Sequence, residues 1–343
     1  MTSAPAPEAA RPGAPAPGDG GARFTLVATA KDEGPYFLEW VAWHRLIGFT
    51  DILVFQNDST DGTDAILKCL DRIGAVRYLY NRAKRGAHQV RAYNRAARQP
   101  EMCGAGWAMA LDMDEFLHVK AGAGTLPDLI AALPGCDQVL VNWRLFGCSG
   151  QDTITDDLVT SRFTRCEDPD RILSDFVGYK SLFRPALFQR AGVHNPSGPR
   201  IAPDAVRLVN GSGLPPDGFT RRKWRTLDPG RRALAQVNHY AVRDAASFVL
   251  KNRRGSAHQS DRDLGQSYWN RRNYNLAEDS GLARMAPAIR AEMARLDALS
   301  DGQLGALRAE AVACHADWFR AALDQPGPAR LYDFCRANLM TGV

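Results

Sequence analysis

Two carboxylates separated by one residue are the first candidates for chemistry. Asp112 and Asp114 lie in the run DMDE at 112–115, directly after an apolar stretch at 107–111 that is typical of a buried strand. Two such side chains at a strand end can share Mg²⁺ or Mn²⁺, which prefer oxygen ligands and leave positions open for a phosphate. A pair of this kind on its own is more often a solvated acidic turn, but its place at a strand end favours a metal site.

Polar residues also follow two earlier apolar stretches. The run NDSTDGT at 57–63 follows the stretch 51–55, and a carboxylate there, from Asp58 or Asp61, could accept hydrogen bonds from a nucleobase or a ribose. Asp61 could equally cap the next helix, and both roles can coexist. Lys31 and Glu33 follow the stretch 24–29 and would line the same crevice, although charges at a helix start also complement its dipole.

Three further positions complete this set. Gln89 and Asn94 lie on a helical pattern that begins near a glycine, and such helix starts suit anions, although an ordinary solvated helix fits as well. His239 closes an apolar stretch at 234–237 and is the best third ligand for a metal, with His194 as its competitor. A lone histidine is more often structural than a ligand, so this assignment depends on its place after a strand.

The elements that must position these residues follow a regular order. Apolar stretches at 24–29, 51–55, 76–80 and 107–111 alternate with helical patterns at 36–47, 65–73 and 87–98. Strands that alternate with helices predict an α/β fold with a doubly wound, mostly parallel sheet. Ligands bind at the carboxyl ends of the strands in such sheets, which is where the polar runs lie.

The second half of the chain is less regular. Strands are expected near 139–143, 162–166, 179–183 and 234–240, a long loop over 194–230, and helices over 244–254, 261–275, 285–299, 301–324 and 328–338. We expect a disordered Ala/Pro/Gly tail over 1–22, a catalytic domain over 23–280 and a helical region over 281–343 that packs on this domain or on a second subunit. The catalytic domain would divide into a nucleotide-binding half, 23–120, and an acceptor half, 121–280.

Composition excludes several classes of protein. The chain has 343 residues, of which 45% are hydrophobic and 24% charged, so collagen-like, coiled-coil and wholly disordered proteins are excluded. The seven cysteines show no zinc or disulfide spacing. Neither a signal peptide nor an apolar stretch of about 18 residues is present, so a cytoplasmic location is expected.

Charge is distributed unevenly. The net charge is +5, and no nucleic-acid recognition motif accompanies it, so no nucleic-acid partner is expected. Between 184 and 272, however, 17 Lys and Arg stand against six Asp and Glu. This excess is compatible with a solvated basic face, with diphosphate or anionic glycan binding, or with peripheral contact with an anionic membrane such as the inner membrane face.

The ordered motifs resemble a known family. The run AKDEGPYFLEW at 30–40 with His44 and Gly48-Phe49, then NDSTDGT at 57–63, then LDMDEFL at 111–117 are similar to the family 2-like glycosyltransferases of the A-type nucleotide-diphospho-sugar fold (GT-A). The similarity is greatest to the bacterial branch related to glycosyltransferase family 92. WRLFG at 143–147, HNP at 194–196 and NHY at 238–240 resemble the same branch, and the similarity covers roughly 23 to 275.

The resemblance implies an activity and a set of roles. It implies metal-dependent transfer of a sugar from a nucleotide-diphospho-sugar, first of all a UDP-sugar, to a hydroxyl of a glycan or lipid-linked acceptor, commonly with inversion. Asp58 would contact the base or ribose with Lys31 and Glu33 nearby, and Asp112 the ribose and the metal. Asp114 and His239 would ligate Mn²⁺ or Mg²⁺. The other substrate-binding candidates are Asp61, Gln89, Asn94, Trp143 and Arg144.

The catalytic base has no clear match. The acidic pair that usually precedes the acceptor-side helix in family 2 is not evident here, so the stereochemical outcome stays open. A carboxylate or a histidine must take the proton of the acceptor. His194 is the favoured candidate, and Asp156, Asp157 and Asp204 are the others.

Two other functions compete with this one. A nucleotidyltransferase on a similar sheet would carry a basic, glycine-rich loop after its first strand, but Asp32 and Glu33 make this position acidic. A non-catalytic glycan- or membrane-surface-binding protein could keep a degenerate transferase fold, and the intact Asp112 and Asp114 argue against it. Glycosyl transfer is therefore the leading hypothesis.

Overall fold

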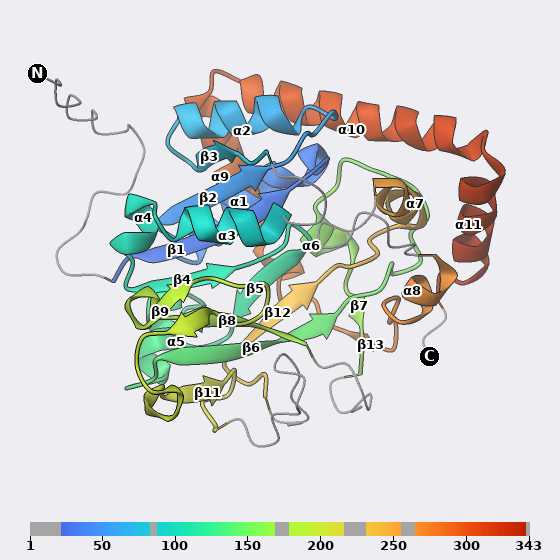
Figure 1. Ribbon diagram of the computed structural model, residues 1–343. Coiled ribbons are helices and arrows are strands. Elements are labelled where there is room, and N and C mark those ends of the chain that lie inside the picture. Colours follow the sequence, from blue (N-terminus) through green and yellow to red (C-terminus); the bar gives the residue numbers. More distant parts are fainter. Residues whose placement is uncertain (1–21, 83–87, 169–177, 216–230, 255–264, 341–343) are drawn as a thin grey trace, which may run out of the picture.

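The computed structural model describes residues 22–82, 88–168, 178–215, 231–254 and 265–340 (Figure 1). Most of the tail expected over 1–22 lies outside these residues, as does the basic run 221–225. Parts of the loop expected over 194–230 and of the helix expected over 261–275 lie outside them as well.

One large sheet organises the part of the chain that the structure describes. Its nine strands include β11 (Leu208–Asn210), which pairs with β6. The other eight lie in the order β3 (Arg77–Tyr80), β2 (Asp51–Gln56), β1 (Phe24–Ala30), β4 (Trp107–Ala110), β8 (Tyr179–Phe183), β6 (Gln138–Leu145), β12 (Ala235–His239) and β5 (Glu115–Val119).

The sheet confirms the α/β class and divides into two parts. β3, β2, β1 and β4 are mutually parallel, as the alternating pattern predicts. In the second part β8 is antiparallel to both β4 and β6, and β5 is antiparallel to β12, so the sheet as a whole is mixed. The mostly parallel arrangement is nevertheless confirmed, because seven of the nine strands run in one direction and β8 and β5 run against them.

Helices cover both faces of the parallel part. Every residue of β1 is buried, as expected for a strand with both faces covered. Leu26 and Ala28 face the larger core with α1 (Phe37–Leu46), α2 (Thr63–Arg72) and α9 (Ala286–Leu299), whereas Val27 and Leu53 face the smaller core with α3 (His88–Ala96). These two layers fix the sheet from both sides.

The carboxyl ends of six strands meet at one edge of the sheet. β1, β2, β3, β4, β6 and β12 all run in one direction, and β8 and β5 begin where those strands end. Beyond this edge lie α7 (Ala245–Arg254), α8 (Gln266–Asn270) and α11 (Pro326–Ala337), which share a separate apolar core (Figure 1). The polar runs after the strands thus lie between the sheet and these helices.

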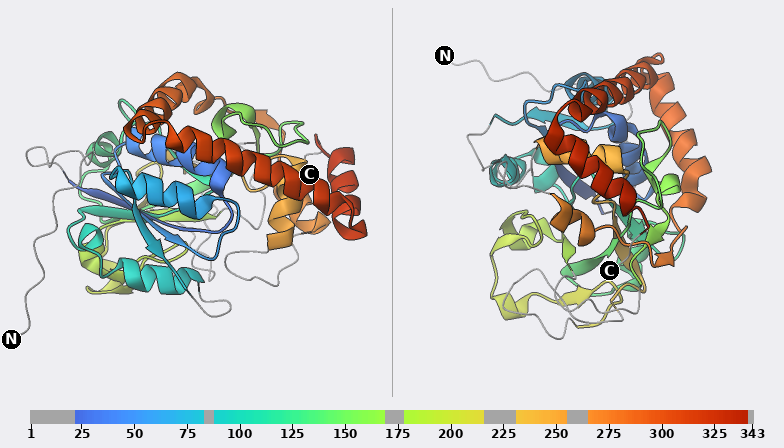
Figure 2. Two further views of the ribbon diagram at one scale, coloured as in Figure 1. Left: turned by 90° about the horizontal axis from the view of Figure 1, so that it is seen from above. Right: turned by 90° about the vertical axis from the view of Figure 1, so that its right-hand side faces the viewer.

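The C-terminal helices are packed on the sheet domain. α10 (Gln303–Leu323) runs along the outside of the molecule, from α2 past the turn Gly34–Tyr36 to α7 (Figure 2). Arg308 Nε donates to the carbonyl oxygen of Pro35 at 3.1 Å, and Leu304 and Ala311 are part of the main core. The region expected over 281–343 therefore shares a core with the sheet, although the domain boundaries stay predictions.

β5 was not expected from the sequence. It begins at Glu115, the last residue of the acidic run, so no residue separates that run from the strand. Two tryptophans of α1 hold it: Trp40 Nε1 donates to the carbonyl of Glu115 at 2.9 Å, and Trp43 Nε1 donates to that of Leu117 at 2.8 Å. β5 thereby fixes the end of the loop that carries Asp112 and Asp114.

Other elements depart from expectation as well. The strand expected over 162–166 is instead α6 (Val159–Arg162) followed by β7 (Arg165–Cys166). In the helix expected over 261–275, α8 ends at Asn270, because Asn273 and Asn275 accept the backbone N–H groups of Cys148 and Ser149 and so favour a non-helical path. The remaining short elements are α4 (Pro100–Cys103), α5 (Leu126–Ala132), β9 (Phe188–Arg190), β10 (Ser197–Pro199) and β13 (Ala277–Glu278).

No helix within the described ranges combines the length and the apolar composition needed to span a lipid bilayer. All seven cysteines lie within those ranges and are free thiols.

His44 generates a prediction about acid stability. Its ring is fully buried in α1, where Nδ1 hydrogen-bonds to the carbonyl of Trp40 at 2.8 Å and Nε2 accepts the N–H of Leu117 at 3.4 Å. Burial lowers the pKa of His44 to about 3, so the ring is neutral in the folded protein. Stability from this group is therefore present above the pKa of the unfolded state, about 6.5, and is lost as pH falls towards 3.

We expect His44→Gln, which keeps a donor and an acceptor, to remove this part of the acid sensitivity. Between pH 7.5 and pH 4.5 the wild-type free energy of unfolding should fall by about 2–3 kcal/mol more than that of the variant. Urea unfolding at both pH values measures the difference, and equal losses in the two proteins would contradict the assignment.

Candidate active site

Asp112 is held by two side chains from different elements. Its Oδ2 lies 2.9 Å from Lys180 Nζ, on β8, and its Oδ1 accepts a hydrogen bond from Gln89 Nε2, on α3, at 3.0 Å. The Asp112 side chain is 32% exposed, whereas that of Lys180 is fully buried. The carboxylate is therefore fixed from the protein side and open to a ligand on the other.

Lys180 serves a second carboxylate, that of Glu115. Lys180 Nζ lies 3.1 Å from Glu115 Oε2, which also accepts the backbone N–H of Asp112 at 2.9 Å. Burial raises the pKa of Glu115 to about 8, while the two acidic partners outweigh burial and raise the pKa of Lys180. Near pH 7 the group is balanced when Asp112 and Lys180 are charged and Glu115 keeps its proton.

Asp114 faces a different set of partners. Its Oδ2 lies 2.6 Å from Lys251 Nζ, on α7, and its Oδ1 lies 3.6 Å from His239 Nε2, at the end of β12. Its carbonyl accepts the N–H of Tyr240 at 2.8 Å, which fixes the loop against β12. Burial disfavours the charged carboxylate, but Lys251, His239 and Arg243 outweigh it and hold the pKa of Asp114 well below its usual range.

The predicted metal ligands come together only in part. Asp114 and His239 face one another and offer an oxygen and a nitrogen, and the other ring nitrogen of His239, Nδ1, is buried without a hydrogen-bond partner. Asp112 is turned to Lys180 instead. Among the described residues no group of three or more His, Cys, Asp or Glu side chains is arranged around one point, so the arrangement offers two ligands for a cation rather than a complete centre.

Trp143 and His194 lie beside this group. The Trp143 ring on β6 is 4.6 Å from the ring of His239 and 5.3 Å from that of His194, measured between centroids. His194 Nδ1 hydrogen-bonds to the carbonyl of Tyr179 at 3.0 Å. Burial, reinforced by the charge of Lys180, lowers the pKa of His194 to about 4, so its ring is neutral at pH 7. The structure thus brings the candidate base to the edge that carries the aspartates.

The remaining candidates divide into structural and exposed positions. Asp61 is buried, and its Oδ2 accepts the N–H of Gly34 at 2.8 Å and contacts His315 Nε2, on α10, at 2.8 Å. Asp58 is exposed, has a positive φ of 43° and accepts the hydroxyl of Tyr80. Asp61 therefore connects its own loop with the turn at Gly34 and with α10, whereas Asp58 is accessible to a ligand.

Glu33 and Arg144 take part in ion pairs. Glu33 Oε2 lies 3.0 Å from Arg243 Nη1, and Arg243 also donates to the carbonyl of Met113 at 3.2 Å. Arg144 Nη1 lies 2.7 Å from Asp279 Oδ2, away from the aspartates of the loop. Lys31 and Asn94 are exposed.

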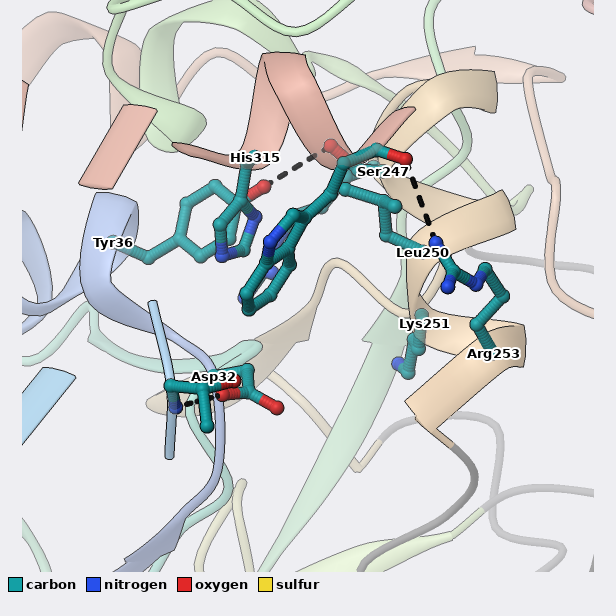
Figure 3. Close-up of a pocket in the computed structure, with 10 residues that line it drawn as sticks. Asp32, Tyr36, Ser247, Leu250, Lys251, Arg253 and His315 are labelled. Atoms are coloured by element: carbon teal, nitrogen blue, oxygen red, sulfur yellow. Dashed lines mark hydrogen bonds between the residues drawn. The ribbon is translucent and has the colours of Figure 1, made fainter. Parts of the chain in front are cut away.

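A cavity of about 360 Å³ is lined in part by Lys251, the partner of Asp114. Figure 3 shows side chains from three parts of the chain facing this space. Asp32 and Tyr36 come from the segment after β1, Ser247, Lys251 and Arg253 from α7, and His315 from α10, which also contributes Trp318. Lys251 therefore belongs to both the cavity and the Asp114 pair.

Sequence reasoning missed the cations of the site. Lys180 had one signal, because it is a single lysine inside the otherwise apolar strand YKSLF. Lys251 stood out within a basic run, for which diphosphate binding was one interpretation, but nothing local places Lys251 on Asp114 or Arg243 on Glu33. The cavity wall formed by α10 depends on contacts across more than 250 residues of sequence, such as Asp61 with His315.

Two curated proteins are similar to the chain. One is a glycosyltransferase family 92 protein of Oryza sativa subsp. japonica, 29% identical over 161 residues, which cover 45% of this chain and 26% of that protein. The other is a glycosyltransferase family 92 protein of Ricinus communis, 26% identical over 191 residues, which cover 51% and 32%. These relatives confirm the resemblance predicted from the motifs, but the chain spans only about a third or less of their length. No family model matches the chain.

Solved structures show a remote likeness. S. aureus TarS 1–349 in complex with UDP-GlcNAc is 14% identical with a TM-score of 0.35, covering 87% of this chain and 92% of that one. Glucosyl-3-phosphoglycerate synthase of Mycobacterium tuberculosis, in complex with Mn²⁺, UDP and glucosyl-3-phosphoglycerate, is 17% identical with a TM-score of 0.29, covering 55% and 70%.

Lys180 and Glu115 generate a paired prediction. Lys180→Met removes a buried ammonium and leaves two carboxyl groups in contact, so we expect the free energy of unfolding to fall by about 2–4 kcal/mol. Glu115→Gln replaces a group that is mostly protonated at pH 7, so we expect a loss under about 1 kcal/mol. Urea unfolding at pH 7 compares the two, and equal losses would contradict the charge balance described above.

Proposed function

We propose that the protein transfers a glycosyl group from a nucleotide-diphospho-sugar to a hydroxyl group of an acceptor. The observation that carries this proposal is the position of Asp112 and Asp114 at the carboxyl edge of the sheet, where Lys251 links Asp114 to a cavity that Arg253 also lines. A site for a nucleotide-diphospho-sugar needs both carboxylates and cations, because the ribose offers hydroxyl donors and the diphosphate carries negative charge. The similarity to glycosyltransferase family 92 proteins supports the same reaction.

The proposed donor would be bound by acidic side chains that follow the strands and by basic side chains of α7. Asp58 and Asp112 are open to solvent and can accept hydrogen bonds from the base or ribose, and a UDP-sugar is the first candidate donor. Arg253 and Lys251 would hold the diphosphate from α7. The leaving diphosphate gains negative charge as the sugar departs, so cations placed beside it lower the barrier.

Asp114 and His239, with Asp112, would hold Mn²⁺ or Mg²⁺ next to the diphosphate. A divalent cation at this point supplies Lewis-acid stabilisation of the leaving diphosphate. Asp114 is suited to this role because its low pKa keeps it ionised at every physiological pH. His239 is suited because its Nε2 faces Asp114, and because burial lowers its pKa, which favours the neutral ring that a metal ligand needs.

The acceptor would be a hydroxyl of a glycan or of a lipid-linked sugar, and transfer would invert the anomeric carbon in one displacement. His194 is the base that we propose. Its neutral ring can take a proton, and its hydrogen bond to the carbonyl of Tyr179 orients the ring through Nδ1. Trp143 packs beside it, with the two ring centroids 5.3 Å apart. Cytoplasmic location and contact with an anionic membrane stay predictions.

A second function is favoured by one observation. Both aspartates are paired with a lysine, which is also how a non-catalytic glycan-binding protein on a degenerate transferase fold would stabilise them. The two functions differ in their nucleotide dependence, since a glycan-binding protein has no use for a nucleoside diphosphate.

Nucleotide binding tests the proposed function directly. We expect one of UDP, GDP, CDP or dTDP, at about 100 times its Kd with Mn²⁺, to stabilise the protein by about 2–3 kcal/mol, seen as a rise in Tm. Asp114→Asn should keep the fold and lose the part of this rise that depends on Mn²⁺. The absence of a rise with all four nucleotides, in a folded sample, would favour the glycan-binding protein.

His194→Gln tests the proposed base. The variant keeps a polar side chain but cannot take a proton, so kcat should fall by about 10²–10⁴-fold while nucleotide affinity stays within about threefold of wild type. Initial rates with the donor identified above, together with the Tm rise, measure both quantities. An unchanged kcat would contradict the assignment of His194 and leave Asp156, Asp157 and Asp204 as candidates for the catalytic base.

A further inference from the structure

The two lysines that contact the acidic loop differ in their freedom to move. Lys180 is fully buried on a central strand, and its ammonium contacts two carboxyl groups, those of Asp112 and Glu115. Lys251 lies on α7, its side chain is 19% exposed, and it lines the cavity. Its ammonium contacts Asp114 Oδ2 at 2.6 Å and the carbonyl of Ala241 at 2.7 Å.

The other cation beside Asp114 is held in place. Arg243 is bound to Glu33 through Nη1 and to the carbonyl of Met113 through Nη2, and its guanidinium lies 3.5 Å from the centroid of the Tyr36 ring. A guanidinium held at both ends cannot leave without breaking all of these contacts. A lysine is a compact charge on a flexible stem, so Lys251 is the cation that can be exchanged.

Lys251 and a divalent cation cannot both occupy Asp114 at full strength. The oxygen of Asp114 that faces His239 is Oδ1, which lies 3.6 Å from His239 Nε2, whereas the ammonium lies on the other oxygen, Oδ2, at 2.6 Å. A cation ligated by Oδ1 would share the charge of one carboxylate with this ammonium, and the two positive charges would repel at so short a separation. Asp114 therefore offers its full charge to a cation held together with His239 only when Lys251 leaves.

We propose that Lys251 exchanges partners on ligand binding. Without ligand it neutralises Asp114; when a diphosphate enters the cavity, its ammonium moves to the phosphate oxygens, and Asp114 and His239 are released to bind the divalent cation. The inference rests on the proposed function for the nature of the ligand. It makes diphosphate and cation binding cooperative, with Lys251 as the coupling residue.

The competing arrangement is a permanent one. Lys251 could stay on Asp114 throughout and serve as the counter-charge of the diphosphate without any metal. The two arrangements differ in how removal of the Lys251 ammonium changes the affinity of the protein for a divalent cation in the absence of a diphosphate. Exchange predicts a gain in metal affinity, whereas permanence predicts none.

The experiment is a Mn²⁺ titration of the full chain, followed by the electron paramagnetic resonance signal of free Mn²⁺, with and without UDP. In wild type we expect UDP to raise Mn²⁺ affinity about tenfold or more. In Lys251→Met we expect Mn²⁺ alone to bind about tenfold more tightly than in wild type, and the effect of UDP to fall below about threefold. Adding Asp114→Asn to Lys251→Met should abolish the gain.

Lys68→Met is the matched control. Lys68 Nζ also lies 2.6 Å from an aspartate, Asp64, but on the surface of α2, where its side chain is 66% exposed. This variant should match wild type in both titrations. Lys251→Gln, which can still donate a hydrogen bond to Asp114, serves as a second variant if Lys251→Met does not fold, and it should show the same gain in Mn²⁺ affinity.

The outcomes separate the inference from the function on which it rests. If UDP stabilises wild type equally with and without Mn²⁺, and Lys251→Met loses UDP binding with no gain in Mn²⁺ affinity, Lys251 is a permanent counter-charge and the exchange is overturned. If neither UDP nor the other nucleoside diphosphates bind wild type at all, the proposed function fails instead.

Discussion

The buried ammonium of Lys180 is the interaction on which the acidic loop depends. A charge removed from water in the centre of a sheet is stable only with close polar partners, and here the carboxylate of Asp112 provides the counter-charge while the protonated carboxyl group of Glu115 provides a second oxygen. Because Lys180 lies inside a strand with neighbours on both sides, these carboxyl groups are fixed relative to the sheet. The backbone then carries Asp114 to the other side of the loop, where the N–H of Tyr240 bonds its carbonyl and the side chain meets α7.

The C-terminal helices extend this fixed edge into a cavity. The sheet alone would leave the turn after β1 open, but α10 covers it through the Asp61–His315 and Arg308–Pro35 contacts. α7 closes a second side and brings Lys251 within reach of both Asp114 and the cavity. The site is thus a joint product of loops near the N-terminus and helices that follow the sheet.

The sequence allowed the parallel half of the sheet and the strand-end residues to be predicted, because both depend on local patterns. A buried strand shows itself as an apolar run, and Asp112, Asp114 and His239 were placed by the ends of such runs. The antiparallel entry of β8 and β5 depends on crossovers that leave no local pattern. The early end of α8 depends on Asn273 and Asn275, whose partners lie about 125 residues earlier in the chain.

The basic partners of the acidic residues could not be predicted, because they lie far away in the sequence. From residue types alone, Asp112, Asp114 and His239 are predicted to be the ligands of a metal. In the folded chain the groups are balanced: Glu33 with Arg243, Asp112 with Lys180 and Asp114 with Lys251, while Glu115 keeps its proton near pH 7.

This balance sets a condition on any diphosphate that enters. Arg253 is the cavity cation that is not part of these ion pairs, and its contact is to the carbonyl of Trp318 at 3.4 Å. A diphosphate brings more negative charge than this one guanidinium can neutralise, and Lys251 can turn to the phosphates only by leaving Asp114 uncompensated. If the proposed diphosphate binds, a divalent cation that enters with it would supply the missing charge at that carboxylate. The proposed metal is thus compatible with the charge of the filled site, even though the ligand-free chain holds its aspartates with lysines.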